Sequence, residues 1–251
     1  MSRQDEVTDL YKMSKRLELF EQILFVGDII AALVSLIPHD MVSKVAISIQ
    51  IIMALLYFIC NTVDDGHFWY MAEKERRKNS IQNGLGIRLG ELNTDGYYNN
   101  DLQPSVNKCA MNTLESNYFS KNIAEKMILK KSVITLAALV VLVASCIYVE
   151  NVNIILIIAQ TAFSAYVFVD FLMLLLYKMR MESLYDTAYN ILILNNSTRD
   201  NTAWLISYIV EYEAIKAHYK VRLDEKIFKD NNDSLSAKWQ EVLSHRCSES
   251  E

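Results

Sequence analysis

The sequence predicts an all-α membrane protein with four transmembrane helices in two hairpins and with helical cytoplasmic extensions. Of its 251 residues 52% are hydrophobic, yet only 6 are Gly and 2 are Pro, which is too few turn formers for a β-rich fold. Charged residues avoid two blocks, 23–63 and 132–177, and each block is long enough for two spanning helices of roughly 20 residues. Short polar links, PHDMVSK and YVENVN, divide the blocks and make each one a tight hairpin.

The four predicted spans differ in how apolar they are. The second, residues 45–63, and the third, residues 133–149, carry no charge, and the fourth, residues 152–177, carries Asp170 alone. The first is interrupted by Asp28 and must extend back through LELFEQ to reach full length. A buried helix that does not cross the membrane is therefore the alternative for this segment.

The distribution of Lys and Arg predicts the orientation. Four lie before the first span, ten in residues 64–131 and ten in residues 178–251, whereas the two hairpin links hold only Lys44. By the positive-inside rule both termini and the central segment are cytoplasmic, and no signal-peptide cleavage pattern follows the first apolar run. The predicted regions are a cytoplasmic amphipathic helix (1–22), a transmembrane hairpin (23–63), a central cytoplasmic segment (64–131), a second transmembrane hairpin (132–177), and a cytoplasmic helical region with a polar tail (178–251).

No catalytic or metal-binding pattern stands out in the sequence. The four histidines are far apart and none pairs with another at metal-ligand spacing, and the four cysteines form no Cys-x-x-Cys pair. Serines lack a Gly-x-Ser-x-Gly setting. We therefore expect no enzyme, no metal and no cofactor, and the net charge of -5 argues against binding to duplex nucleic acid.

Two carboxylates within the predicted spans are the main functional candidates. An ionised aspartate in the middle of a spanning helix costs on the order of 3 kcal/mol, so Asp28 and Asp170 should face a bundle interior or a wet cavity. They could form carboxylate rings that line a cation pore once several copies assemble, because one four-helix bundle is too tightly packed to conduct. The alternative is packing, in which each aspartate hydrogen-bonds to an amide side chain of another helix. The other polar candidates in the spans are Gln50, Asn61 and Gln160.

The central segment holds a second candidate site. Its first part, HFWY at residues 67–70, is typical of an interfacial aromatic belt, with ligand stacking as the alternative. Glu73 and Arg77 have the spacing of an ordinary surface pair on a helix. The later TDGYYNN stretch is a turn whose polar groups suit a small ligand or a partner, unless it simply packs on its own domain. The candidate residues of this loop are Asp95, Tyr97, Tyr98, Asn99 and Asn100.

The region after the fourth span is predicted to be helical. The helix should continue without a breaker to Asn195, and NNSTRDNT should then form a turn. In the next helix, apolar and aromatic residues recur at alternating steps of three and four, which predicts a stripe that packs on the central segment or on a neighbouring copy. The tail from KDNNDS onward is polar, with LSAKWQEVL as one last short helix. The stripe consists of Leu205, Tyr208, Tyr212, Ile215 and Tyr219.

The layout resembles the SMODS-associated four-transmembrane effectors of bacterial anti-phage signalling, over roughly residues 15 to 225. AEKERRKNSIQNGLG, LESNYFSKNIAEKM and YKMRMESLYDTAYNIL fall where that family has comparable helices. The resemblance implies an effector of the bacterial inner membrane that forms pores or disrupts the bilayer when a cyclic-nucleotide signal is made. The homo-oligomer is inferred from pore geometry instead, because one four-helix bundle is too tightly packed to conduct. The resemblance rests on architecture, so no functional residue is transferred from it.

The sequence therefore gives two function hypotheses. The first is an effector that oligomerises and permeabilises the membrane on a cytoplasmic signal or on contact with a protein partner. The second is a non-conducting scaffold or sensor subunit that recruits a soluble partner. A transporter or an intramembrane enzyme would need more polar residues in the spans.

Overall fold

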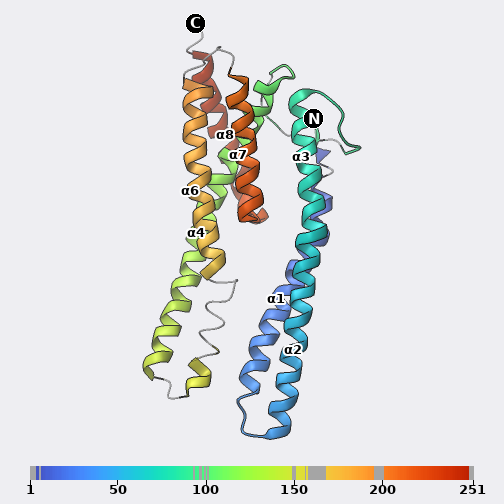
Figure 1. Ribbon diagram of the computed structural model, residues 1–251. Coiled ribbons are helices and arrows are strands. Elements are labelled where there is room, and N and C mark those ends of the chain that lie inside the picture. Colours follow the sequence, from blue (N-terminus) through green and yellow to red (C-terminus); the bar gives the residue numbers. More distant parts are fainter. Residues whose placement is uncertain are drawn as a thin grey trace.

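The computed structural model describes residues 4–5, 7–92, 94–95, 98, 100, 102–148, 151–155, 157, 168–194 and 201–248 (Figure 1). These residues are almost entirely helical, in agreement with the composition. The α-helices are α1 (Tyr11–Val34), α2 (Asp40–Val63), α3 (Trp69–Leu85), α4 (Val106–Tyr148), α6 (Asp170–Tyr189), α7 (Thr202–Tyr219) and α8 (Glu225–Ser248). A 3-10 turn, η1 (Val7–Leu10), precedes α1, and two π-helical segments are η2 (Asp64–Phe68) and η4 (Asn190–Leu194). Two-residue strands β1 (Gln4–Asp5) and β2 (Thr94–Asp95) pair antiparallel.

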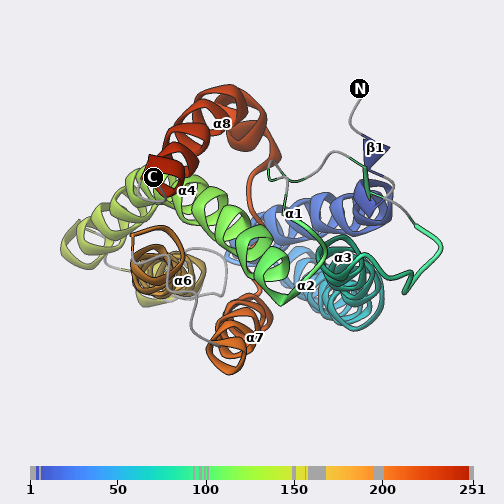
Figure 2. The ribbon, with the colours of Figure 1, turned by 90° about the horizontal axis from the view of Figure 1, so that it is seen from above.

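The helices form two columns (Figures 1 and 2). The first column contains α1 and the continuous rod α2–η2–α3, and the second contains α4, α6, α7 and α8. The turn between α1 and α2, at Pro38, lies at one end of the molecule, and both chain termini lie at the other (Figure 1). The predicted cytoplasmic helix and first span are thus one helix, α1, which packs along α2.

Two glycines allow helices to approach closely. A Cβ added at Gly27 would lie 2.8 Å from Sδ of Met53, so Gly27 brings α1 against α2. A Cβ at Gly84 would lie 2.3 Å from Sγ and 2.9 Å from Cα of Cys109, so Gly84 is the contact between α3 and α4. Gly86 then ends α3 with a φ of 65°, a left-handed conformation that Gly adopts without strain.

The hydrophobic core of the second column is rich in aromatic residues. Tyr118 of α4 packs against Tyr185 of α6 and Trp239 of α8, with ring centroids 5.8 and 5.5 Å apart. Trp239 is almost fully buried, so the tail that the sequence suggests to be mostly polar is instead a 24-residue helix held by this core. The predicted stripe on α7 is confirmed for its four buried members, Leu205, Tyr208, Tyr212 and Ile215.

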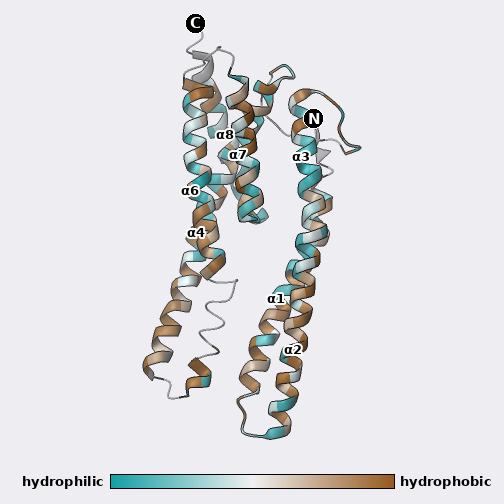
Figure 3. Ribbon diagram, viewed as in Figure 1, coloured by the Kyte–Doolittle hydropathy of each residue, from teal (hydrophilic) through white to brown (hydrophobic). Residues whose placement is uncertain are grey.

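Hydropathy divides the molecule into two halves (Figure 3). The apolar half comprises residues 23–63, 129–148, 151–155, 157 and 168–176, and the polar half comprises the rest of the described residues. In the apolar half large side chains face outward: Phe58 is 66% exposed and Val133 is 68% exposed. Two helices, Asp40–Leu85 and Val106–Ala144, contain apolar windows long enough to cross a membrane, and only 6% of each window is buried inside the molecule.

These findings are compatible with a membrane protein and leave two of the four predicted spans as predictions. The helix α1 carries Glu18, Glu21 and Asp28, which lower its mean hydropathy. Of the fourth predicted span, most of residues 152–167 lies outside the described residues.

Candidate functional site: a charged cavity between the two columns

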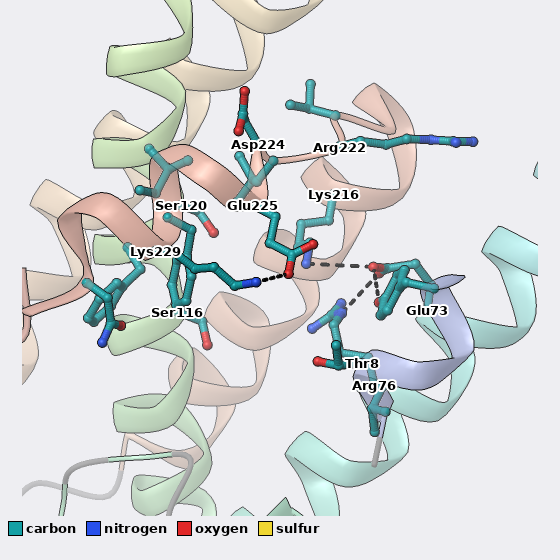
Figure 4. Close-up of a pocket in the computed structure, with 18 of the residues that line it drawn as sticks. Thr8, Glu73, Arg76, Ser116, Ser120, Lys216, Arg222, Asp224, Glu225 and Lys229 are labelled. Atoms are coloured by element: carbon teal, nitrogen blue, oxygen red, sulfur yellow. Dashed lines mark hydrogen bonds and ion pairs between the residues drawn. The ribbon is translucent and has the colours of Figure 1, made fainter. Parts of the chain in front are cut away.

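A cavity of about 1180 Å³ lies in the polar half, between the two columns (Figure 4). Its walls come from the start of α1, from α3, from the middle of α4, from the end of α7 and from the first half of α8. Small-molecule sites are typically about 300–1,000 Å³, so the cavity is large enough for a ligand with several polar groups. Both charged and aromatic side chains line it, including Tyr11, Trp69, Phe119 and Phe228.

A buried charge cluster joins α3 to α7 at the cavity wall. Arg76 pairs with Glu73 at 3.0 Å and with Glu213 at 2.5 Å, and Nε of Arg77 donates to the same Glu213 carboxylate at 2.9 Å. The hydroxyl of Tyr11 also donates to Glu73, at 2.8 Å. Buried charges are stable only when paired and hydrogen-bonded, and these two arginines and two carboxylates satisfy one another.

The protonation of this cluster follows from its pairing. Burial alone would raise the pKa of Glu73, but the adjacent cations Lys216 and Arg76, together with the hydrogen bond from Tyr11, lower it to about 2. The pKa of Glu213 is also lowered, since Arg76 and Lys216 outweigh its desolvation. Both carboxylates are therefore ionised at neutral pH.

Lys216 is the poorly paired member of the cluster. Its Nζ lies 3.9 Å from Oε1 of Glu73, and among the described residues no acceptor lies within hydrogen-bonding distance of it. Burial and the neighbouring Arg76 lower the pKa of Lys216 to about 8. Figure 4 shows this ammonium between α7 and α3, on the cavity wall.

A second ionic contact joins the columns where α2 passes into α3. Asp64, fully buried at the start of η2, accepts from Arg222 at 2.7 Å and from Ser14 at 3.0 Å. The same guanidinium lies 3.3 Å from Asp65 and 4.7 Å from the ring centre of Trp69, a cation–π distance. Arg222, in the link between α7 and α8, thus holds the second column to the π-segment of the first.

The structure places the two span aspartates at different levels of solvation. Asp28 is half-buried in α1, and its Oδ1 has no hydrogen-bond partner among the described residues. Asp170 is the first residue of α6 and pairs with Nζ of Lys131 at 3.2 Å, with 48% of its side chain exposed. Lys131 also lines the cavity, so one lysine contacts both the cavity and a span carboxylate.

The remaining span candidates are dispersed. Asn61 of α2 donates to Glu21 of α1 at 3.4 Å, so it makes a hydrogen bond between two packed helices. Gln50 is half-exposed on α2, away from the cavity lining. Gln160 lies outside the described residues.

The described part of the TDGYYNN loop packs on the first column and on α4. The hydroxyl of Tyr98 donates to Ser80 at 3.3 Å and Tyr98 lines the cavity, whereas Asn100 donates to Asn112 at 2.7 Å. Asp95 belongs to β2, where its backbone is in register with Gln4. Tyr97 and Asn99 lie outside the described residues.

Sequence reasoning missed the residues that make the cavity. Glu73 and Arg77 form the predicted pair, at 3.7 Å, but it is not a surface pair: only 8% of the Glu73 side chain is exposed, and its closer partner is Arg76. The missed signal lies in α7, where two charged residues, Glu213 and Lys216, follow the buried Tyr212 within about one turn. Trp69, expected in an interfacial belt, contacts Tyr11 at 5.3 Å between ring centres and lines the cavity.

Comparison with family models, with curated proteins and with solved structures gives no match for this chain. The family resemblance drawn from the layout accordingly stays a prediction.

Proposed function

We propose that this protein is an effector of the bacterial inner membrane that permeabilises or depolarises it when a cytoplasmic signal reaches the charged cavity. The position of the cavity is the observation that supports this proposal most directly. Its walls come from both columns, and the wall helices α3 and α4 continue into the two apolar segments that are long enough to cross a membrane. A ligand that changes the separation of the columns would therefore move the apolar segments as well.

The pairing of Asp170 suggests how a resting state is kept closed. Lys131 neutralises Asp170, and the same lysine lines the cavity. A signal that attracts Lys131 would release the carboxylate, which could then contribute to a cation-selective ring in a homo-oligomer. In anti-phage defence such a signal would be produced after infection, and a cyclic nucleotide or a cytoplasmic protein are the expected kinds.

The test is the membrane potential of bacteria that express the chain, measured with a potential-sensitive dye. We expect wild type to depolarise the cells on activation, and Asp28→Ala and Asp170→Ala to abolish depolarisation at matched membrane levels. Asp40→Ala is the matched control, because Asp40 is an exposed carboxylate in the first turn of α2 and should leave the activity unchanged. Depolarisation that persists in both aspartate variants would contradict a carboxylate-lined path.

A second candidate function, a scaffold or sensor subunit, is favoured by one observation. Ile206 and Val210, one turn apart on α7, are 48% and 60% exposed in the polar half, where a soluble partner could cover them. This function predicts that the membrane potential stays intact, even when neighbouring genes are expressed and activated by infection. It also predicts a protein that co-purifies with wild type but not with Val210→Lys.

A further inference from the structure

We propose that the cavity binds a phosphate ester that carries hydroxyl groups, with its phosphate on Lys216 and a hydroxyl on Asn79. The inference deepens the proposed function, because it assigns a chemical class to the signal. It rests on two incompletely satisfied polar groups that line the cavity, one on α3 and one on α7, and on the ion pairs of the cluster between these helices.

The first observation is that Lys216 is surplus to the charge cluster it belongs to. Arg76 and Arg77 already match Glu73 and Glu213 one to one, through four ion pairs. The ammonium of Lys216 has three donors, yet its nearest carboxylate oxygen is 3.9 Å away. A largely buried ammonium whose nearest carboxylate oxygen is too far for a hydrogen bond is costly, so a ligand that supplies anionic oxygens would gain more here than at a surface lysine.

The second observation concerns Asn79, which lines the cavity on α3. Asn79 is 4% exposed, and its amide donates to the backbone oxygen of Glu75 at 3.0 Å. Its Oδ1 has no hydrogen-bond partner among the described residues. A buried acceptor left without a donor is costly, and a ligand hydroxyl would remove that cost.

The surroundings suit a compact polar ligand. Ser116 and Ser120 of α4 add hydroxyl groups to the wall that faces α3 and α7 (Figure 4). On the α8 side, Lys15 and Lys229 both bond to Glu225. Phosphate oxygens accept from several such donors at once, and their negative charge makes these hydrogen bonds stronger than those of a neutral ligand.

The experiment uses the full chain in phosphatidylcholine nanodiscs, with thermal unfolding followed by tryptophan fluorescence. Glycerol 3-phosphate should raise the midpoint of unfolding, since a ligand that binds the folded state stabilises it by mass action. Glycerol and sodium chloride at equal ionic strength should not. Lys216→Met should weaken the apparent affinity about ten-fold or more. Lys238→Met, on the exposed face of α8, removes the same charge and should keep the affinity.

Two further arms complete the test. In Ser116→Asp an added carboxylate at the wall should abolish the shift, which keeps the proposal testable if Lys216→Met does not fold. Nanodiscs that contain phosphatidylglycerol, without the soluble ester, test a lipid headgroup as the source: a shift that depends on Lys216 there assigns the site to lipid. The proposal is wrong if neither source shifts the wild-type midpoint, or if Lys216→Met and Ser116→Asp shift as wild type does.

The readout separates this inference from the proposed function. Binding in nanodiscs without depolarisation in cells would refute the effector proposal and leave the phosphate site standing. Depolarisation without binding of either probe would refute the site alone.

Discussion

The polar and apolar halves of this protein distribute their side chains in opposite ways. In the polar half carboxylates such as Glu73 and Asp64 are buried, each held by at least one arginine. In the apolar half Phe58 and Val133 face outward, and few side chains are buried. A chain that buries charge at one end and exposes apolar surface at the other is built for two solvents. The stability of the polar half should therefore depend on single ion pairs, and the stability of the apolar half should depend on the solvent around it.

The largest loss of stability is expected when the ionic contact between the columns is broken. Arg222→Met leaves the buried Asp64 carboxylate without its cation, which should lower the free energy of unfolding by about 3–5 kcal/mol. Thermal unfolding of the purified protein in detergent checks it. Arg88→Met is the control, because Arg88 is exposed and should change stability little.

Adding Asp64→Asn to Arg222→Met removes the uncompensated charge and should restore part of the lost stability. If the single and double variants unfold at the same midpoint, the contact is not the source of the effect.

The next effect depends on pH and concerns the cluster between α3 and α7. The pKa of Glu73 is lowered to about 2 in the folded state, from about 4.5 when unfolded. A lowered carboxylate pKa contributes stability above the unfolded value, on the order of 3 kcal/mol here, and this contribution is lost as pH falls from about 4.5 towards 2. In Glu73→Gln the free energy of unfolding, measured between pH 7 and pH 3, should therefore fall less steeply at the acid end than in wild type.

Glu75→Gln, two residues along α3, should keep the acid dependence of wild type. Equal slopes at the acid end for wild type and Glu73→Gln would show that Glu73 does not carry this acid dependence.

The smallest effect compares two glycines of the same rod. Gly84→Ala forces the new methyl group onto the Cα of Cys109, 2.9 Å away, and should cost about 1–3 kcal/mol, because backbone and side chain must shift. Gly66→Ala, at the start of the polar half, meets nothing within 4 Å and should be neutral or slightly stabilising. Chemical denaturation of both variants checks the difference, and equal midpoints would mean that α3 and α4 separate at little cost.

The sequence predicts the helices better than the site, and the reason is physical. Helix periodicity and apolar length are local, so the apolar segments that begin at Val45 and Val133 and the stripe on α7 can be recognised without knowing what they contact. The cavity is made by residues more than a hundred positions apart, such as Arg76 and Lys216. Glu73 and Arg77 have the spacing of a surface pair whether or not another helix covers them, so only the packed fold distinguishes the two cases.

The two aspartates in apolar runs show the same difference between local and distant information. A charge in an apolar run can be recognised from sequence, and Asp28 and Asp170 were found in this way. The sequence does not identify Lys131 as the partner of Asp170, because Lys131 lies 39 positions away, in another helix. The long tail helix was underestimated because Leu235 and Trp239 are its only strongly buried apolar residues among those described.

The continuity of α2, η2 and α3 has a mechanical consequence. The helix from Asp40 to Leu85 contains 46 residues and is roughly 70 Å long at about 1.5 Å per residue, more than twice the thickness of a hydrocarbon core of about 30 Å. One end contributes residues to the cavity wall and the other is apolar. Such a rod acts as a lever: a tilt of roughly 10° would displace one end relative to the other by about 12 Å, given that length. A small movement at Glu73, which Lys216 contacts, would then need no relay of side chains to reach the apolar end of the rod.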